Sequence, residues 1–430
     1  MSAISEKDTL FVWHPFTHLK LAEKPINIVR SAGTYYYDDE GNKIIDAISS
    51  WWVNLHGHCH PHISKKVSVQ LFQNEHSIFS GFTHPNAVLL AERLLQHLPR
   101  NQSKIFYSDN GSTAVEVALK MVLQYWHNAG IKKNKFIAFT NAYHGDTFGG
   151  MSVGARNAFN NAFSSSLFEV IHYPVPKEVE LEPYFAAFEK SVAQEEIAGF
   201  IFEPLVQGAA GMMMHKEEYL DKLLEICKNH KVITIADEVM TGFGRTGNFF
   251  ASDQLEHKPD IICLSKGLTG GYMPLGVTSC AEFIYQAYIS DDKNKTFFHG
   301  HSYTANPTAC AAALASLDIL EKTETWENIS LINNLHELFV NELHKKFPGI
   351  NYRIRGTILA IEIGTEEGTH YLNPLAEDIA QFFIRRHVLL RPLGNIIYII
   401  PPYCISGSDL EHIYNSIFDF LSQLDHEPKK

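Results

Sequence analysis

The sequence predicts an α/β protein, with a large domain on a mostly parallel sheet and a small α+β domain assembled from both chain ends. The middle of the chain alternates short apolar segments with amphipathic helices, the pattern of parallel strands buried on both faces. The 430 residues, 45% of them hydrophobic, provide a large core and favour two or three domains over one. We expect 1–60 and 325–430 to form the small domain and 61–324 to form the large, cofactor-binding domain.

The chain ends carry the elements of the small domain. Residues 30–48 alternate around the turn sequence DDEGN, which predicts an antiparallel hairpin. The large domain is expected to begin with a helix over 61–75, because proline is favoured at the first helical position. Near the other end, a helix from 325 leads into short strands and a last helix at 408–424.

Five apolar segments in the middle of the chain are predicted to be buried strands. They are KIFYSD (104–109), KFIAFT (135–140), GFIFEP (199–204), VITIADE (232–238) and DIICLS (260–265). Amphipathic helices at 112–126 and 217–230 separate some of them. In open parallel sheets, ligands bind beyond the carboxyl ends of the strands, so the residues that follow each strand are candidate site residues.

Charge and composition argue against several classes of protein. The formal net charge is −12 and basic residues are scattered, so a general nucleic-acid binder is not expected. No apolar run reaches the roughly 18 residues of a membrane helix, and the N-terminal residues lack the pattern of a secretory signal. The six cysteines are far apart and form no CxxC pair, which favours reduced thiols in a cytoplasmic protein.

The first two strand ends suggest a phosphate site and a stacking ring. Gly111 and Ser112 open a helix, where free N–H groups and the positive dipole end suit a phosphate. The alternative is a plain helix cap by Ser112 or Thr113. Tyr143 follows the second strand, where it either stacks on a planar ligand or is a partly buried loop aromatic.

Two later strand ends carry an acid and a lysine. Asp237 could bind magnesium beside a nucleotide or pair with a cationic nitrogen, but the chain has no GxxxxGK[ST] loop for a nucleotide. Lys266 is either a snorkelling surface residue or a buried Schiff-base nucleophile. The sequence GFGRTG at 242–247 matches GxGxxG but lacks the strand before it and the helix after it, so a dinucleotide site is not expected.

Together these strand ends supply a phosphate cradle, a stacking aromatic, an acid for a ring nitrogen and a Schiff-base lysine. Pyridoxal phosphate (PLP) needs all four. Its aldehyde bonds to an amine, a nearby carboxylate favours its protonated pyridine nitrogen, and its phosphate anchors it. The set therefore predicts PLP as the cofactor.

The sequences IADEVMTGFGRTG and PDIICLSKGLTGGYMPLG resemble the signature of class III aminotransferases of fold type I, and the resemblance extends over nearly the whole chain. It implies catalytic roles for Lys266, which bonds to the cofactor, Asp237, which pairs with the pyridinium nitrogen, and Tyr143, which stacks on the ring. The implied cofactor-binding residues are Gly111, Ser112, Tyr143, Asp237, Lys266, His301 and Ser302. The implied substrate-binding residues are Phe16, Trp51, Trp52, Gly300, Arg391 and Tyr398.

Shorter segments, among them VWHPFTHL, SSWWVNLHGH and LLRPLGNIIYIIPPY, are similar to the branch of this family that acts in biotin synthesis. That branch implies transfer of an amino group to 8-amino-7-oxononanoate, with S-adenosylmethionine as the expected donor. Lysine as the donor, or another ω-amino acid or diamine as the substrate, is the alternative. The resemblance also implies a homodimer, because the segment matching His301 and Ser302 reaches the phosphate from the partner subunit.

Four positions do not transfer cleanly from this branch. Phe16 stands where tyrosine is common, so it keeps a stacking face and loses a hydroxyl. His301 and Ser302 stand where a proline–threonine pair is familiar, and the serine retains a donor hydroxyl. Arg245 is expected near the site without a defined task.

The stretch NLHGHCHPHIS at 54–64 has the composition of a metal site and raises the alternative of a metal-dependent hydrolase. Alternate histidines share a face only on a straight strand, and Gly57 and Pro61 make such a strand improbable. We therefore expect no metal site here, and interpret the stretch as a junction between domains beside Trp51 and Trp52.

Overall fold

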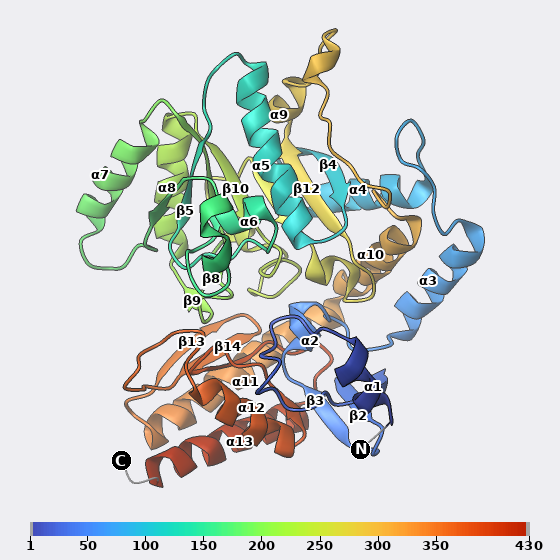
Figure 1. The fold of residues 1–430 in the computed structure, drawn as a ribbon, viewed down its shortest axis with the longest axis vertical. Helices are drawn as coiled ribbons and strands as arrows, with labels where there is room; N and C mark the ends of the chain where they lie inside the picture. Colours follow the sequence, from blue (N-terminus) through green and yellow to red (C-terminus); the bar gives the residue numbers. More distant parts are fainter. Residues whose placement is uncertain (1–2, 427–430) are drawn as a thin grey trace.

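A seven-stranded sheet forms the centre of the computed structural model, which describes residues 3–426 (Figure 1). The strands lie in the order β4 (Gln102–Ser108), β12 (Gly276–Ala281), β11 (Ile261–Leu264), β10 (Ile233–Asp237), β7 (Ile197–Phe202), β5 (Lys135–Phe139) and β6 (Val170–Tyr173). All strands run parallel except β12, which is antiparallel to both of its neighbours. The predicted α/β class is therefore confirmed, although β6 and the reversed strand β12 were not predicted.

Alternate residues of each central strand enter two hydrophobic clusters, one on each face of the sheet. In β5, Phe136 and Ala138 join one cluster while Ile137 and Phe139 join the other. This is why the strands are apolar throughout. The helices on the two sides are α3 (Pro61–Gln73), α4 (Pro85–His97), α5 (Gly111–Asn128), α6 (Phe148–Val153), α7 (Leu181–Val192), α8 (Glu217–Asn229), α9 (Glu282–Gln286) and α10 (Pro307–Leu320).

Both chain ends contribute to the lower part of the molecule in Figure 1. A four-stranded sheet has the order β1 (Ile28–Ala32), β2 (Tyr35–Asp38), β3 (Lys43–Asp46) and β15 (Val388–Leu389). The predicted hairpin is present as β2 and β3, and the parallel pairing of β3 with β15 joins the two ends of the chain. A three-stranded antiparallel sheet has the order β13 (Asn351–Arg355), β14 (Ile358–Glu362) and β16 (Ile396–Ile399).

The remaining elements complete this lower part and the loops above it. The helices are α1 (Ala3–Phe11), the short α2 (Ser49–Trp52), α11 (Thr323–Lys346), α12 (Leu375–Arg385) and α13 (Gly407–His426). The short pieces are β8 (Val206–Gln207), β9 (Met213–Met214) and the 3₁₀ turns η1 (Asn161–Ser166), η2 (Ala251–Gln254), η3 (Lys266–Thr269) and η4 (Lys293–Lys295). The outermost residues of the two predicted small-domain segments, 1–2 and 427–430, lie outside the described residues.

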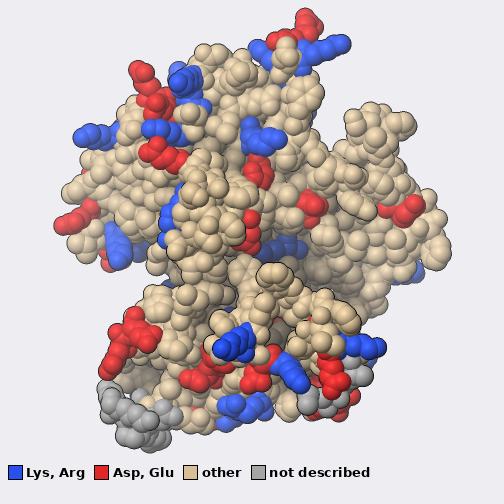
Figure 2. All heavy atoms as spheres, viewed as in Figure 1, with Lys and Arg blue, Asp and Glu red and all other residues tan. Residues whose placement is uncertain are grey.

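Charges of both signs are interspersed on the face shown in Figure 2. The formal net charge of the full sequence is −12. Within residues 3–426, no helix is both long enough and apolar enough to cross a membrane.

Candidate active site

The carboxyl ends of the parallel strands meet around a cavity of about 440 Å³. The cavity brings together six of the residues predicted from the sequence: Trp52, Gly111, Ser112, Tyr143, Asp237 and Lys266. It also receives residues that were not predicted, among them His144, Glu203 and Gly145. A single edge of the sheet thus collects the phosphate, aromatic, acid and amine groups that the strand ends suggested.

Lys266 begins η3 directly after β11 and has a left-handed backbone, with φ of 45°. Its surroundings lower the pKa of the ammonium group from 10.5 to about 8, because burial penalises the charged form more than Asp237 and Glu203 stabilise it. The Nζ atom lies 4.4 Å from the centre of the Trp52 ring, a cation–π contact. A substantial fraction of the amine is therefore neutral and nucleophilic near neutral pH.

Asp237 ends β10 and is 6% exposed. His144 Nδ1 donates to its Oδ2 at 2.8 Å, and the backbone N–H of Val239 donates to its Oδ1 at 3.1 Å. The far nitrogen of the same ring, His144 Nε2, is buried without a protein partner. The carboxylate is thus held in a fixed orientation, as an acid that pairs with a ring nitrogen must be.

Glu203 is a second buried acid, which the reading of strand ends missed although it directly follows β7. Its carboxylate accepts hydrogen bonds from the backbone N–H groups of Tyr143 at 3.1 Å and Gly208 at 2.8 Å. Burial nevertheless raises its pKa from 4.5 to about 7. Near neutral pH this carboxyl can therefore exist in either protonation state beside Lys266.

The start of α5 forms the expected cradle, but its cap is not the one considered. The N-cap residue is Asn110, whose Oδ1 accepts from Thr113 N at 3.0 Å. The alternative that Ser112 or Thr113 is the N-cap residue is therefore wrong. The N–H groups of Gly111 and Ser112 lie at the helix start, where no intrahelical acceptor exists. A Cβ on Gly145 would overlap Ser112 Oγ, so glycine is needed for the loops to close around this hydroxyl.

Tyr143 lines the cavity beside this cradle, and its hydroxyl donates to Asp146 Oδ2 at 2.9 Å. Burial and the negative charge of Asp146 raise the pKa of the phenol well above its ordinary value. The ring therefore stays neutral and presents an aromatic face, as a residue that stacks on a planar cofactor requires.

The predicted substrate residues form an aromatic cluster next to the cavity. Arg391 lies 4.5 Å from the centre of the Trp51 ring and donates to the carbonyl of Phe16 at 3.4 Å. Phe16 packs edge-on against Trp51 at 5.4 Å. Arg391 is half-buried, so its guanidinium keeps access to the opening between these rings.

Trp52 links this cluster to the cavity. Its indole Nε1–H donates to the hydroxyl of Tyr398 at 3.0 Å, and both side chains are buried. Two further aromatic residues that sequence reasoning missed, Phe159 and Tyr371, stand beside the cluster with ring centres 4.5 Å apart. Phe159 also contacts Phe16 at 5.9 Å, so the aromatic surface is broader than predicted.

Gly300, His301 and Ser302 do not line the cavity of the chain that carries Lys266. They lie in the loop before α10, where His301 N donates to Thr304 Oγ1 at 3.2 Å.

Arg245 is 1% exposed and spans the junction between the two parts of the molecule. Its guanidinium donates to the carbonyls of Pro401 at 2.8 Å, Asn54 at 3.3 Å and Trp52 at 3.5 Å. The surrounding segment 242–247 forms irregular turns followed by η2, so GFGRTG does not open a helix after a strand.

The four histidines of NLHGHCHPHIS have separate partners. His56 contacts Ser316 Oγ at 3.0 Å, His58 donates to Asp46, His60 caps α3, and His62 pairs with Asp318 at 2.8 Å. Among residues 3–426, no three histidine, cysteine, aspartate or glutamate side chains are placed to hold a metal ion together. Pro61 is the first residue of α3, as predicted.

The groups around the cavity fit PLP. The glycine-lined helix start offers N–H donors and a hydroxyl to a phosphate, and Tyr143 offers a ring face. Asp237 offers a fixed carboxylate to a ring nitrogen, and Lys266 offers a partly neutral amine to an aldehyde. The orphaned His144 Nε2 shows that a polar group is accommodated next to Asp237.

Comparisons with known proteins agree with this geometry. The aminotransferase class-III family matches residues 19–421. The adenosylmethionine-8-amino-7-oxononanoate aminotransferase of Synechococcus elongatus is 45% identical over 424 residues, which cover 96% of this chain and 99% of that protein. The crystal structure of the enzyme of the same name from Methanocaldococcus jannaschii superposes with a TM-score of 0.93 at 36% identity, covering 98% of each chain. An amine transaminase from an uncultivated Pseudomonas species, solved in its PLP-bound form, superposes with a TM-score of 0.87 at 30% identity, covering 94% of this chain and 97% of that one.

Proposed function

The chain belongs to the class-III aminotransferase family, and from this premise we propose that it converts 8-amino-7-oxononanoate to 7,8-diaminononanoate with S-adenosylmethionine as the amino donor. It is a PLP-dependent aminotransferase of fold type I. The metal-dependent hydrolase considered for the histidine-rich stretch is contradicted by this assignment. The observation that carries the proposal is the convergence of Lys266, Asp237, Tyr143 and the start of α5 on one cavity, with the buried indole of Trp52 4.4 Å from Lys266 Nζ.

PLP supplies an aldehyde that bonds to amines and a ring that accepts electrons from the carbon losing its proton. The chain supplies the proton transfer. Lys266, with a pKa of about 8, is poised near neutral pH to take a proton at Nζ from the donor's carbon and to return it. Asp237 would face the ring nitrogen of the bound cofactor, with its carboxylate oriented by His144 and the N–H of Val239.

The aromatic cluster supplies recognition of both substrates. We assign the carboxylate of the keto acid to Arg391, whose planar guanidinium suits a bidentate partner. The chain of the keto acid then lies against Trp51 and Trp52, and Tyr398 fixes Trp52 through its hydroxyl. The flat adenine of the donor can use the face of Phe16, which retains stacking without a hydroxyl.

Two measurements test the assignment. Lys266→Ala should abolish turnover and the visible absorbance of the lysine-bound cofactor, and normal turnover in that variant would sink the proposal. A donor screen with wild-type protein then distinguishes S-adenosylmethionine from lysine and from ω-amines by loss of that absorbance. Conversion of the bound cofactor by lysine alone would reassign the donor and leave the reaction class intact.

We propose a homodimer with a site completed by the segment 300–302 of the second copy. Large hydrophobic side chains are exposed on one chain, including Trp13 at 83%, Phe72 at 94% and Phe298 at 75%, and a second copy would cover such a surface. The test mixes Lys266→Ala chains with Ser302→Trp chains. Each variant alone should be inactive, and mixed dimers should regain activity, because one of the two sites then has both an intact Lys266 and an intact Ser302. No recovery in verified mixed dimers would contradict a shared site.

We also propose domain boundaries at 60/61 and 324/325 and a cytoplasmic location. Pro61 begins α3, which supports the first boundary, whereas the second lies within the first turn of α11, which begins at Thr323. Limited proteolysis tests whether the chain is cut first near these two positions. All six cysteines are free thiols, which suits a reducing compartment. Cell fractionation tests the location.

A further inference from the structure

The turn that carries the two substrate-facing tryptophans has an unusual backbone. Ser49, Ser50 and Trp52 have φ of 52°, 63° and 67°, and Ser50 combines its positive φ with ψ of −89°. Side-chain-bearing residues rarely adopt this left-handed region, and the conformation persists only where surrounding groups impose it. The segment Ser49–Trp52 is called the tryptophan turn below.

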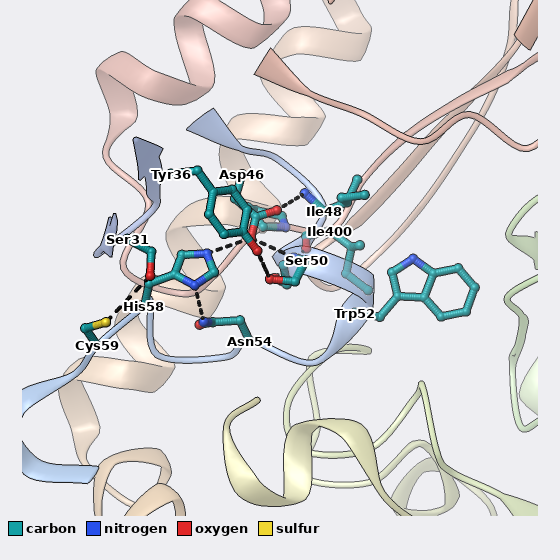
Figure 3. A network of polar contacts seen from close by, with 12 residues as sticks. Ser31, Tyr36, Asp46, Ile48, Ser50, Trp52, Asn54, His58, Cys59 and Ile400 are labelled. Carbon is teal, nitrogen blue, oxygen red and sulfur yellow. Dashed lines mark hydrogen bonds and ion pairs between the residues drawn. The ribbon is translucent and has the colours of Figure 1, made fainter. Parts of the chain in front are cut away.

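Asp46 is the group that imposes it. This carboxylate is fully buried, at 0% exposure, at the end of β3. Its Oδ1 accepts from Ile48 N at 3.2 Å, and its Oδ2 accepts from Ser50 N at 2.6 Å and from Ser50 Oγ at 3.3 Å (Figure 3). The backbone of the turn is thus wrapped around one buried carboxylate, as in an Asx turn.

His58 supplies the remaining donor to this carboxylate. Its Nε2–H donates to Asp46 Oδ2 at 2.9 Å, while Asn54 Nδ2 donates to its Nδ1 at 3.1 Å. The tautomer with its proton on Nε2 satisfies both partners. The backbone of His58 is itself fixed by paired hydrogen bonds with Gly33, at 2.7 and 3.0 Å, and its ring lies 4.4 Å from that of Tyr36.

The two indoles of the tryptophan turn point toward the candidate active site. Figure 3 shows the indole of Trp52 directed away from Asp46 and His58. That indole lies 4.4 Å from Lys266 Nζ and bonds to Tyr398, and the neighbouring Trp51 lies against Arg391. The position of both indoles therefore depends on the backbone angles that Asp46 fixes.

We propose that His58 is a positioning residue for the reaction: by bonding to Asp46 it holds the tryptophan turn, and through the turn it sets the aromatic wall against Lys266 and Arg391. The inference deepens the proposed function and rests on it for the identity of the substrates. It assigns a function to one histidine of the NLHGHCHPHIS stretch, and this function is positioning of the backbone, not metal binding.

The test compares three variants of the holoenzyme. His58→Leu removes the donor, and His58→Gln retains an N–H group the same number of bonds from the backbone. His62→Leu is the matched control. His62 lies four residues after His58 and also pairs with an aspartate, but that aspartate, Asp318, does not bond to the tryptophan turn. The readouts are KM and kcat for the keto acid, and hydrogen exchange of a peptide covering 47–55.

His58→Leu should raise KM by roughly ten- to a hundredfold, the equivalent of one lost hydrogen bond to a charged group, while kcat changes less. Exchange of the 47–55 peptide should accelerate, and His58→Gln should restore much of both quantities. If His58→Leu does not fold, the His58→Gln variant decides. A KM and an exchange rate equal to those of the wild type support the role of His58 as a donor, and a ten- to hundredfold increase in KM contradicts it.

The inference is overturned if His58→Leu and His62→Leu have the same KM and the same exchange rate over 47–55. The exchange readout needs no substrate, so it tests the clamp even if the enzyme uses another amine. Failure of the proposed function would appear separately, as absence of amino transfer in the wild type.

Discussion

Replacing Lys266 with methionine should stabilise the cofactor-free protein at neutral pH. The pKa of Lys266 falls from 10.5 to about 8 in the folded chain, so the protonated form is disfavoured there. At about 1.4 kcal/mol per pKa unit, this costs the fold about 3 kcal/mol below pH 8, where the ammonium is charged in both folded and unfolded states. Methionine carries no charge, so it should raise the free energy of unfolding by about 3 kcal/mol at pH 7.

The sign of the pH dependence follows from the same values. As pH rises from 8 to 10.5, the folded wild-type protein releases the Lys266 proton before the unfolded chain does, so its stability rises and the advantage of the variant disappears. Urea denaturation of both cofactor-free proteins from pH 7 to pH 10 measures the difference directly. Methionine at the exposed Lys132 is the control and should show no such trend. A Lys266→Met protein that is less stable at pH 7, or whose advantage is independent of pH, refutes the reasoning.

Three further predictions concern other groups around the cavity. Asp237→Asn should weaken PLP binding by roughly ten- to a hundredfold, the loss of one charge-assisted interaction, in an absorbance titration of the cofactor-free protein. Unchanged affinity would remove Asp237 from the ring-nitrogen role. Gly145→Ala should also weaken PLP binding, because the new Cβ overlaps Ser112 Oγ, whereas Gly130→Ala, at a similarly left-handed φ of 72° with open space around it, should leave PLP affinity unchanged. Burial raises the pKa of Glu203 to about 7, so the folded protein takes up its proton first as pH falls. The wild type should therefore gain stability relative to Glu203→Gln between pH 8 and pH 5, and parallel stability curves would contradict this.

The strand ends could be interpreted from sequence because parallel strands bring their carboxyl ends to one edge. That rule located Gly111, Tyr143, Asp237 and Lys266 without knowledge of the fold's details. Glu203 obeys the same rule, because it is the residue directly after β7. It was missed because the predicted strand GFIFEP already contained it.

Contacts that cross between the two parts of the molecule could not be predicted in this way. The bond from Trp52 to Tyr398 joins residues 346 positions apart, and no periodicity in either segment encodes it. The two segments are joined nearby by hydrogen bonds from Ile400 N to Ala47 O at 3.0 Å and from Ser49 Oγ to Ile400 O at 2.8 Å. The positive φ angles of Ser49 and Ser50 could not be predicted either, because serine has no preference for this region and the buried carboxylate that imposes it is not evident from the sequence.

The pairing of β3 with β15 also orders events during synthesis. The strands and loops that surround Lys266 lie between residues 102 and 281, so the ribosome has released them long before Arg391 and Tyr398 emerge. Trp51 and Trp52 are made first of all and must wait for partners from the far end of the chain. Lys266 and the strand ends beside it can therefore assemble on an unfinished chain, but the aromatic cluster that joins Trp51 and Trp52 to Arg391 and Tyr398 forms last, and a nascent chain cut short before residue 388 lacks the latter two residues.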